Sequence, residues 1–368
     1  MPRKYRIIIA VVLTLLTSTF YGQDVHFSQF YNSPLSLNPA TTGDFVGAWR
    51  VTGIGRQQWA HKNLTTEGKP FQTMAIGFDS PIDFGHKGRL GVGGYLVQDN
   101  SGIANLNYSK FVGSIAYETN LKGGKIRFGI QPSLNQHGSD RIEHVLDGHA
   151  FSKSQLEANN GKLYDDGNPF DATRIESIDN NSQQLKYFDI NAGVKWSKKI
   201  NKLETTAGFS AFHLILPKYT LLEAESGGRM PIRYNFHSSL SYKYNDKLYI
   251  QPNLQFMHMA RAQNIVIGAN VDYNIQDRID LFNSAFAGLQ FRTLSGRNRD
   301  IGKLSNSDSF ALIAGVTLPK WRIGLSRDMT ISNLQSGLAD LSGAWEISVI
   351  YTAPDVFLNK KLIPCDRY

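Results

Sequence analysis

Cysteine and long apolar runs are what this 368-residue chain has least of. Cys365 is the single cysteine, so the chain cannot form an internal disulfide framework. Beyond the N-terminus, no stretch approaches the roughly twenty consecutive apolar residues that a transmembrane helix requires. The two absences exclude a small disulfide-stapled domain and a membrane protein built from helices.

Familiar catalytic and ligand-binding motifs are absent as well. Gly324–Asp328 lacks the second glycine of a nucleophile elbow. His137, His144 and His149 have no spacing that would hold two of them on one rigid element, and Asp165–Asn168 lacks the remaining ligands of a calcium loop. We therefore expect no catalytic residues, no bound metal and no cofactor.

The formal net charge is +8, but its distribution does not indicate nucleic-acid binding. Such binding requires basic clusters interleaved with stacking aromatics. In this chain the charges and the aromatics fall on opposite faces of the expected strands. The basic residues instead gather at the expected tight turns, namely Lys87, Arg89, Lys122, Lys125, Lys198, Lys199, Lys202 and Lys320.

The N-terminus has the pattern of a secretory signal peptide. Arg3, Lys4 and Arg6 precede Ile7–Leu16, an apolar run of the length typical of a signal-peptide core. We expect cleavage between Gly22 and Gln23, which would remove residues 1–22; the alternative is a retained N-terminal anchor. No cysteine follows the apolar run, so this is not a lipoprotein signal. An exported chain without transmembrane helices is either soluble or an outer-membrane barrel.

The stretch Gly343–Tyr351 has the alternating pattern of a β-strand with one apolar face. Its alternate residues give one apolar face with an aromatic side chain near each end, as in a strand that crosses a bilayer. A strand of a soluble β-sandwich would show the same alternation. The other expected strands are 49–59, 71–80, 89–98, 109–119, 125–135, 186–197, 203–213, 233–243, 248–258, 264–274, 280–291, 310–318 and 321–328.

Strand length and loop order favour the membrane. The strands reach roughly ten residues, the length that a tilted strand needs to cross a bilayer. Short and long connections alternate, apart from the short connection 258–262, as they do in bacterial barrels with periplasmic turns and outer loops. We predict an all-β fold, a transmembrane antiparallel outer-membrane β-barrel of about fourteen strands with both termini in the periplasm.

This topology divides the chain into four parts. Residues 1–22 are the signal peptide, and residues 23–47 form an N-terminal segment with Pro34 and Pro39 that we expect to pack in the lumen or at the periplasmic mouth. The barrel spans 48–352, and 353–368 is a periplasmic tail. The extracellular loop 137–185 is the longest connection and a possible partner-binding site through its acidic residues, among them Asp147, Asp165, Asp166 and Asp171.

Several charged residues fall on the lumen face of the predicted strands. Two interpretations remain open for them: they line an open pore, or they form salt bridges that close it. The residues are Arg50, Arg56, Lys110, Glu118, Lys195, Arg233 and Asp272.

Five short stretches, in this order, resemble one known family. They are Gln23–Gly43, Arg56–Trp59, Ile323–Leu334, Gly343–Tyr351 and Pro364–Tyr368. Together they are similar to the PorP/SprF family of Bacteroidota over nearly the whole mature chain. The positions that carry the resemblance are Asn38, Pro39, Gly43, Arg56, Trp59, Gly343, Glu346, Ser348 and Tyr351.

The resemblance implies an outer-membrane barrel of the type IX secretion system, which in gliding members is linked to motility. It implies a role in secretion or surface anchoring of a very large adhesin through the adhesin's C-terminal domain, alongside other secretion and gliding components. It implies no catalytic residues and no small-molecule substrate, and membrane lipid surrounds the barrel. The alternative is an outer-membrane channel for small solutes.

Overall fold

The computed structural model describes residues 26–58, 71–84, 88–101, 106–138, 184–218, 229–260, 262–275, 282–295, 307–331 and 343–354. Three short helices come first: η1 (Phe30–Asn32), α2 (Pro34–Leu37) and η2 (Pro39–Thr41). No helix in the described part of the chain is both long and apolar enough to cross a membrane.

Fourteen strands follow within the described ranges. They are β1 (Arg50–Gln58), β2 (Phe71–Asp83), β3 (Arg89–Ser101), β4 (Leu106–Leu121), β5 (Gly124–Gly138), β6 (Gln184–Ile200), β7 (Leu203–Phe212), β8 (Arg233–Lys243), β9 (Leu248–Met259), β10 (Ala262–Asn274), β11 (Ser284–Ser295), β12 (Ser307–Thr317), β13 (Trp321–Thr330) and β14 (Ala344–Thr352).

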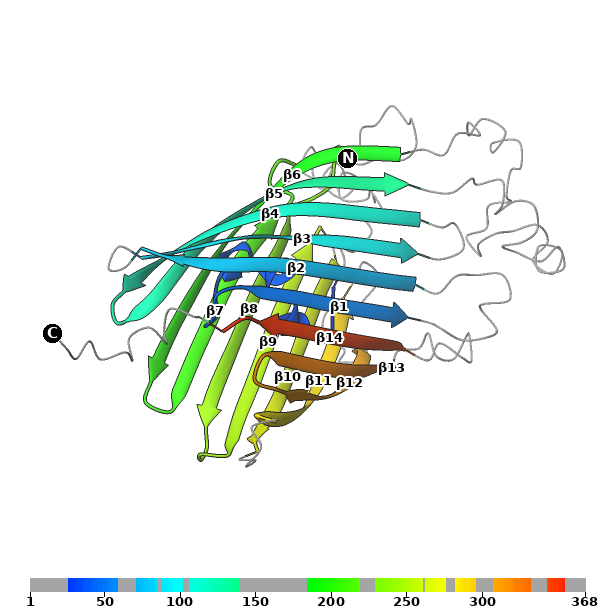
Figure 1. The fold of residues 1–368 in the computed structure, drawn as a ribbon. Coiled ribbons are helices and arrows are strands. Elements are labelled where there is room, and N and C mark those ends of the chain that lie inside the picture. Colours follow the sequence, from blue (N-terminus) through cyan, green and yellow to red (C-terminus); the bar gives the residue numbers. More distant parts are fainter. Residues whose placement is uncertain are drawn as a thin grey trace, which may run out of the picture.

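The strands form one closed antiparallel barrel, in which every strand pairs with its neighbours in sequence (Figure 1). Closure comes from β1 and β14, which pair from Arg50↔Thr352 to Gln58↔Ala344. Closure removes the unpaired strand edges that could not persist in lipid. The predicted closed barrel of fourteen strands is therefore confirmed.

The two ends of the barrel differ in their connections. At the turn end, β2–β3, β4–β5, β6–β7, β8–β9, β10–β11 and β12–β13 are joined, and β1 begins beside the end of β14. At the loop end lie the remaining connections, including the one between β5 and β6. That connection runs over 139–183, because β5 extends to Gly138 and β6 starts at Gln184, so the expected loop 137–185 is too long by two residues at each side.

Stacked aromatic rings explain this longer pairing. His137 lies between Tyr108 and Tyr187, with ring centroids 4.2 and 5.8 Å apart. Cross-strand aromatic pairs stabilise a sheet, so they extend the ladder into what the sequence suggested was loop. Other boundaries differ as well. β4 starts at Leu106 rather than at Ser109, and β12 starts at Ser307 rather than at Phe310, whereas β11 starts later than expected, at Ser284 rather than at Asp280.

The outer wall is apolar and the inner face is polar, the reverse of a soluble protein. Large apolar side chains on the outer positions are about half exposed, for example Leu134 at 62% and Ile267 at 55%. On the same strands, Asn135 and Asn270 face the lumen and are buried. This inversion is the arrangement that a barrel in lipid requires.

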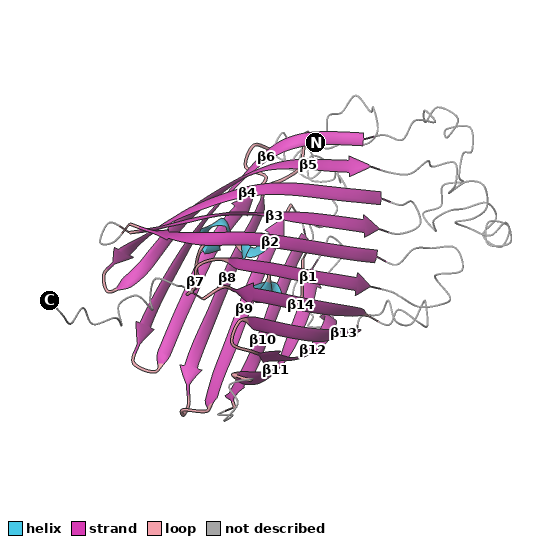
Figure 2. Ribbon diagram, viewed as in Figure 1, coloured by secondary structure: helices cyan, strands magenta, loops and turns pink. Residues whose placement is uncertain are grey.

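The N-terminal segment lies inside the barrel rather than on its surface. Figure 2 shows the short helices enclosed by the strands, and η2 contacts β4, β5 and β6 while η1 contacts β14. Residues 26–48 are called the plug below. Only Trp49 separates the plug from β1, so the chain leaves the lumen at the turn end and enters the wall there.

Candidate functional site

The contact surface between the plug and the lumen wall is the candidate functional site, and Asn38 is at its centre. Asn38 is fully buried, and its amide donates to the carbonyl oxygens of Val194 (3.1 Å) and Phe209 (3.3 Å). Its own side-chain oxygen accepts from Ala40 N at 2.9 Å, which caps η2. Pro39 takes the first position of η2, where its missing N–H costs nothing. The Asn-Pro pair therefore both starts a helix and fixes it to the wall.

Glycines on the wall make room for this turn. A Cβ added at Gly129 would lie 2.2 Å from Pro39 C, and one at Gly193 would lie 2.1 Å from Asn38 Oδ1. The two glycines are paired in register on β5 and β6. Absence of side chains at both positions lets the plug backbone approach the strands closely.

A second attachment lies where the plug turns into β1. Gly43 has φ +67° and its N–H donates to Asp79 Oδ2 at 2.7 Å. Asp79 also accepts from Arg50 Nε (3.0 Å) and Nη2 (2.7 Å), a bidentate ion pair with no exposure on the Asp79 side. A Cβ at Gly43 would lie 2.6 Å from Gly91 Cα, so this turn requires glycine for space as well as for backbone conformation.

A third attachment is built on Arg127, whose side chain is 1% exposed. Its guanidinium donates to Ala40 O at 2.9 Å and to Thr42 O, and pairs with Glu118 at 2.5 Å. Asp44 pairs with Lys195 beside it. Burial opposes ionisation of Asp44, but Lys195 and Arg127 outweigh burial and hold its pKa below the usual value.

The start of the plug is held by two carboxylates. Glu346 accepts from Ser28 N (2.9 Å) and Gln29 N (2.6 Å), and Ser28 Oγ donates to Asp328 at 2.6 Å. Arg56 pairs with Asp328 (2.9 Å) and with Glu346 (3.3 Å). The group is buried, so each charge depends on its partners for stabilisation.

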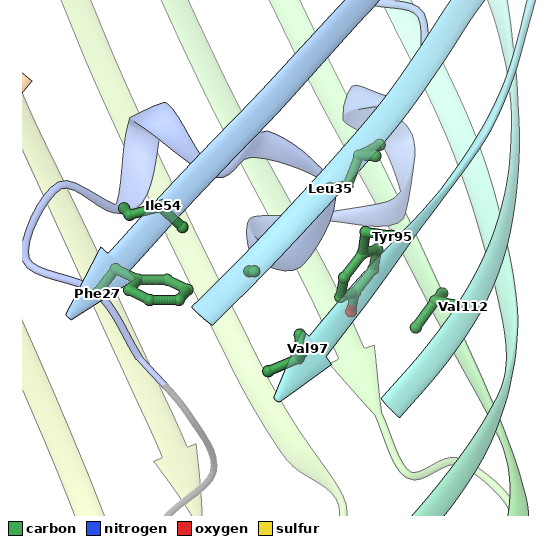
Figure 3. Close-up of a cluster of buried hydrophobic side chains, with 7 residues drawn as sticks. Phe27, Leu35, Ile54, Tyr95, Val97 and Val112 are labelled. Atoms are coloured by element: carbon green, nitrogen blue, oxygen red, sulfur yellow. The ribbon is translucent and has the colours of Figure 1, made fainter. Parts of the chain in front are cut away.

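Apolar contacts complete the docking. Figure 3 shows Phe27 and Leu35 of the plug among side chains from β1, β3 and β4, a cluster completed by Ala75. On the opposite side, Phe30 and Leu37 pack on Val266. Tyr31 packs against them and its hydroxyl donates to Asn270 at 3.3 Å; burial raises the pKa of Tyr31 to about 12.

The structure brings most of the signature positions to this contact surface. Asn38, Pro39, Gly43, Arg56 and Glu346 take part as described above. Ser348 accepts a hydrogen bond from Asn32 at 2.9 Å and donates one to Gln29 at 2.8 Å.

Two signature positions lie elsewhere. Tyr351 faces outward, with its ring 5.0 Å from that of Trp49 and 4.7 Å from that of Trp321, as in an interfacial aromatic girdle. Gly343, at φ +69°, precedes β14 where a Cβ would lie 1.9 Å from Asp328 O. The remaining named residues lie outside the described part of the chain: Gly22, Gln23, Trp59, Asp147, Asp165, Asp166 and Asp171.

Most of the charged residues predicted on the lumen face form ion pairs, which agrees with the interpretation that salt bridges close the lumen. Arg50, Arg56, Glu118 and Lys195 are in ion pairs with or beside the plug, and Asp272 pairs with Arg322 at 3.2 Å. Lys110 and Arg233 lie over the ring of Phe212, at 5.8 and 4.0 Å. Reading the sequence did not identify Asp79, Arg127 or Asp328. The signal that could have identified them is a charged residue at a position of the strand that faces the lumen.

The lumen face of β9–β11 is different, because buried amides there lack partners within the described residues. Gln290 and Asn264 are 3% and 5% exposed, and neither their oxygen nor their nitrogen is bonded. A small cavity lies beside Gln290, Arg292 and Ser28. Across the described residues no group of three or more potential metal ligands occurs.

Within the described residues, the site is a docked peptide held by hydrogen bonds to buried polar and charged side chains of the wall and by the ion pair of Asp44 with Lys195. Among solved structures, similar folds include the CymD monoaromatic hydrocarbon channel (TM-score 0.47, 10% identity, 90% of this chain and 95% of that chain). They also include a Pseudomonas aeruginosa FadL homologue (0.45, 13%, 87% and 94%) and the Pseudomonas putida toluene transporter TodX (0.43, 10%, 91% and 94%).

No curated protein matches the chain. A family model, described as type IX secretion system membrane protein PorP/SprF, matches residues 19–351. This chain, a β-barrel membrane protein, therefore belongs to the PorP/SprF family of the type IX secretion system.

Proposed function

We propose that this chain is a non-enzymatic outer-membrane scaffold of the type IX secretion system. It supports secretion or surface anchoring of a large adhesin through the adhesin's C-terminal domain, in concert with other secretion and gliding components. The signal peptide is cleaved, the turn end and both termini face the periplasm, and the loop end faces outward. Nucleic acid, cofactors and small-molecule substrates have no part in this function.

The docked plug is the observation that supports a scaffold over a channel. It occupies lumen space and contacts strands on opposite sides of the barrel. Near both of its ends, at Ser28 and Gly43, it donates hydrogen bonds to buried carboxylates that are ion-paired with arginines of the wall. Because the lumen is occupied by the chain's own plug, partners would bind to the surfaces at the ends of the barrel. The acidic connection 139–183 is the longest of these surfaces and is the proposed docking site for the adhesin.

The test is an affinity pull-down of the tagged barrel from outer membranes, followed by mass spectrometry. We expect one very large secreted protein, bound through its C-terminal domain. A variant with Asp147, Asp165, Asp166 and Asp171 changed to Asn should release that protein into the medium while the barrel still assembles. If the variant still retains the secreted protein, the loop is not its docking site. If no secreted protein co-purifies with the wild-type barrel, the anchoring function is wrong.

The second candidate is an outer-membrane channel for small solutes. The unpartnered amides of Gln290 and Asn264 favour it, because buried polar groups of this kind are ordinarily satisfied by water. A hydrated path along β9–β11, beside the plug, would carry small solutes. Planar-bilayer recordings of the intact barrel distinguish the two candidates, since only the channel conducts without displacement of the plug.

A further inference from the structure

Three neighbouring hairpins at the turn end carry an excess of lysine. They are the β4–β5, β6–β7 and β8–β9 connections with the residues beside them. Glu204 and Asp246 are the acidic residues of these tips, and the lysines are Lys122, Lys125, Lys198, Lys199, Lys202, Lys243 and Lys247. Lys125 and Lys243 are paired, with Glu118 and Asp246. The others form no salt bridge with any described residue.

The three hairpins form one continuous rim. Lys243 N donates to Lys202 O at 2.9 Å, which joins the second hairpin to the third. A Cβ at Gly124 would lie 3.3 Å from Lys198 Cβ, so the first and second hairpins also adjoin. The lysines therefore act as one field of positive charge, which we call the basic rim.

Each hairpin tip also exposes one large apolar side chain next to its lysines. Leu121 is 43% exposed, Ile200 is 51% exposed and Tyr244 is 58% exposed. A turn that faced only water would gain nothing from these side chains. Apolar side chains beside lysines suit the boundary of a bilayer, where the apolar part enters the lipid and the ammonium group stays at the headgroups.

Strand length places this rim at the membrane surface. β7 and β8 have 10 and 11 residues, which matches the length that a tilted strand needs to cross the hydrocarbon. The β6–β7 and β8–β9 tips therefore begin where these strands leave the hydrocarbon. Tyr242, 42% exposed on the outer wall, lies two residues before Tyr244, at the level where an aromatic girdle belongs.

We propose that the basic rim binds the phosphate groups of anionic phospholipids in the adjacent leaflet. Lysines near a membrane surface attract anionic lipid, and each contributes about 1 kcal/mol, a factor of about five in affinity. The exposed apolar residue on every tip favours a lipid surface over an acidic protein. The inference goes beyond the scaffold function and holds whichever end faces the periplasm.

The test uses the full-length barrel in mixed detergent micelles with equimolar phosphatidylglycerol and phosphatidylcholine, read by native mass spectrometry. The wild type should retain phosphatidylglycerol preferentially. Lys202→Gln/Lys247→Gln should lower that preference by about tenfold or more, since two lysines are removed. The matched control is Lys186→Gln/Lys218→Gln, two exposed lysines of the loop-end half, and it should keep the wild-type preference.

The outcomes separate the sources of the anion. Retention of phosphatidylglycerol in the presence of millimolar inorganic phosphate supports a lipid site, whereas displacement by phosphate would reduce the rim to a site for the free anion and overturn the proposal. Equal retention of the two lipids by the wild type would also overturn it, as would an equal loss in the control. Binding of polyglutamate without any lipid preference would reassign the rim to an acidic protein. Folding of each variant is checked by its heat-modifiable mobility.

Discussion

Asp79 on β2 links the plug to β1 and β2 at the turn end. It is fully buried and accepts from Gly43 N and from two nitrogens of Arg50. Asp79→Asn leaves the Arg50 guanidinium without its counter-charge, and breaking a buried pair in this way costs about 3–5 kcal/mol. Denaturant unfolding of the purified barrel in detergent should show a loss of this size.

Asp83→Asn is the matched control for that measurement. Asp83 lies on the same strand and pairs with Arg89, but its side chain is 66% exposed. An exposed pair contributes about 1 kcal/mol or less, so this variant should remain close to the wild type. Equal losses in the two variants would show that the buried ion pair of Asp79 contributes no more to the free energy of unfolding than the exposed pair of Asp83.

Asp44 gives the plug a dependence on acid. Lys195 and Arg127 hold its pKa below the usual value despite burial, so the folded protein binds this proton more weakly than the unfolded chain. The stability from the ionised form is therefore present above the unfolded pKa and is lost as the pH falls through the folded pKa. We expect the thermal unfolding midpoint of the wild type to decrease as the pH falls through this range. In Asp44→Asn the midpoint should depend less on pH.

Asp246 provides the comparison for this pH profile. It is fully exposed and its pKa is also lowered, first through its hydrogen bond with Lys243. Screening by solvent makes its effect on stability small. Asp246→Asn should show the same decrease of the thermal midpoint from neutral to acid pH as the wild type. If its pH dependence were reduced as much as in Asp44→Asn, the effect could not be attributed to the buried Asp44.

At the scale of elements, the docking of η2 depends on two missing side chains. The three atoms nearest to a Cβ at Gly129 all belong to Pro39 and Ala40. Gly129→Leu therefore overpacks the contact, at a cost of about 1–3 kcal/mol, and should displace the plug while the strand ladder persists. Hydrogen exchange of the plug amides should accelerate accordingly, and that of β10 should not.

Gly113→Leu tests whether any large residue on a barrel glycine has this effect. Gly113 is on the outer side of β4, and the nearest atom to its added Cβ is Pro132 Cγ at 4.0 Å. The leucine would point into lipid and leave the plug unaffected. Acceleration of plug exchange in this variant as well would show that the glycines act through strand flexibility rather than through space.

The strands were predictable and the plug contacts were not, for a physical reason. Alternation in β14 is a local pattern, because successive side chains on a strand face opposite sides, and the alternation of loop lengths supplied the topology. The partner of Ser28 is Glu346, 318 residues away, and no local pattern connects the two. The sequence therefore predicted that the N-terminal segment packs in the lumen or at its mouth and that charged residues face the lumen. It did not predict which of these charges pair with one another.

One local signal that the sequence analysis did not use marks the contact surface. Gly129 and Gly193 break the inward polar pattern of β5 and β6 at paired positions. Glycine in the interior of a strand often marks the close approach of another backbone. Together with Asn38 and Pro39 in the N-terminal segment, these glycines indicate where the chain would return to the wall, although they do not name the partner atoms.

At the scale of the whole molecule, the charges inside the lumen are matched rather than arranged as a single-sign pore. Arg56 and Arg292 face Asp328 and Glu346, and Arg50 faces Asp79. Opposite charges at these distances attract each other more strongly than they attract passing ions. Among the described residues, a cluster of lysines without salt bridges lies on the rim, outside the lumen, where it can meet a membrane surface.

A conductance measurement examines the whole assembly of plug and barrel. Intact wild type in planar bilayers should stay mostly closed, because the plug fills lumen space and its charges are paired. Gly129→Leu, in which the plug is displaced, should open to a conductance many times larger, and Gly113→Leu should resemble the wild type. If the wild type already conducts as well as Gly129→Leu, the plug does not close the barrel. The hydrated face of β9–β11 would then be the path, and the channel function would replace the scaffold.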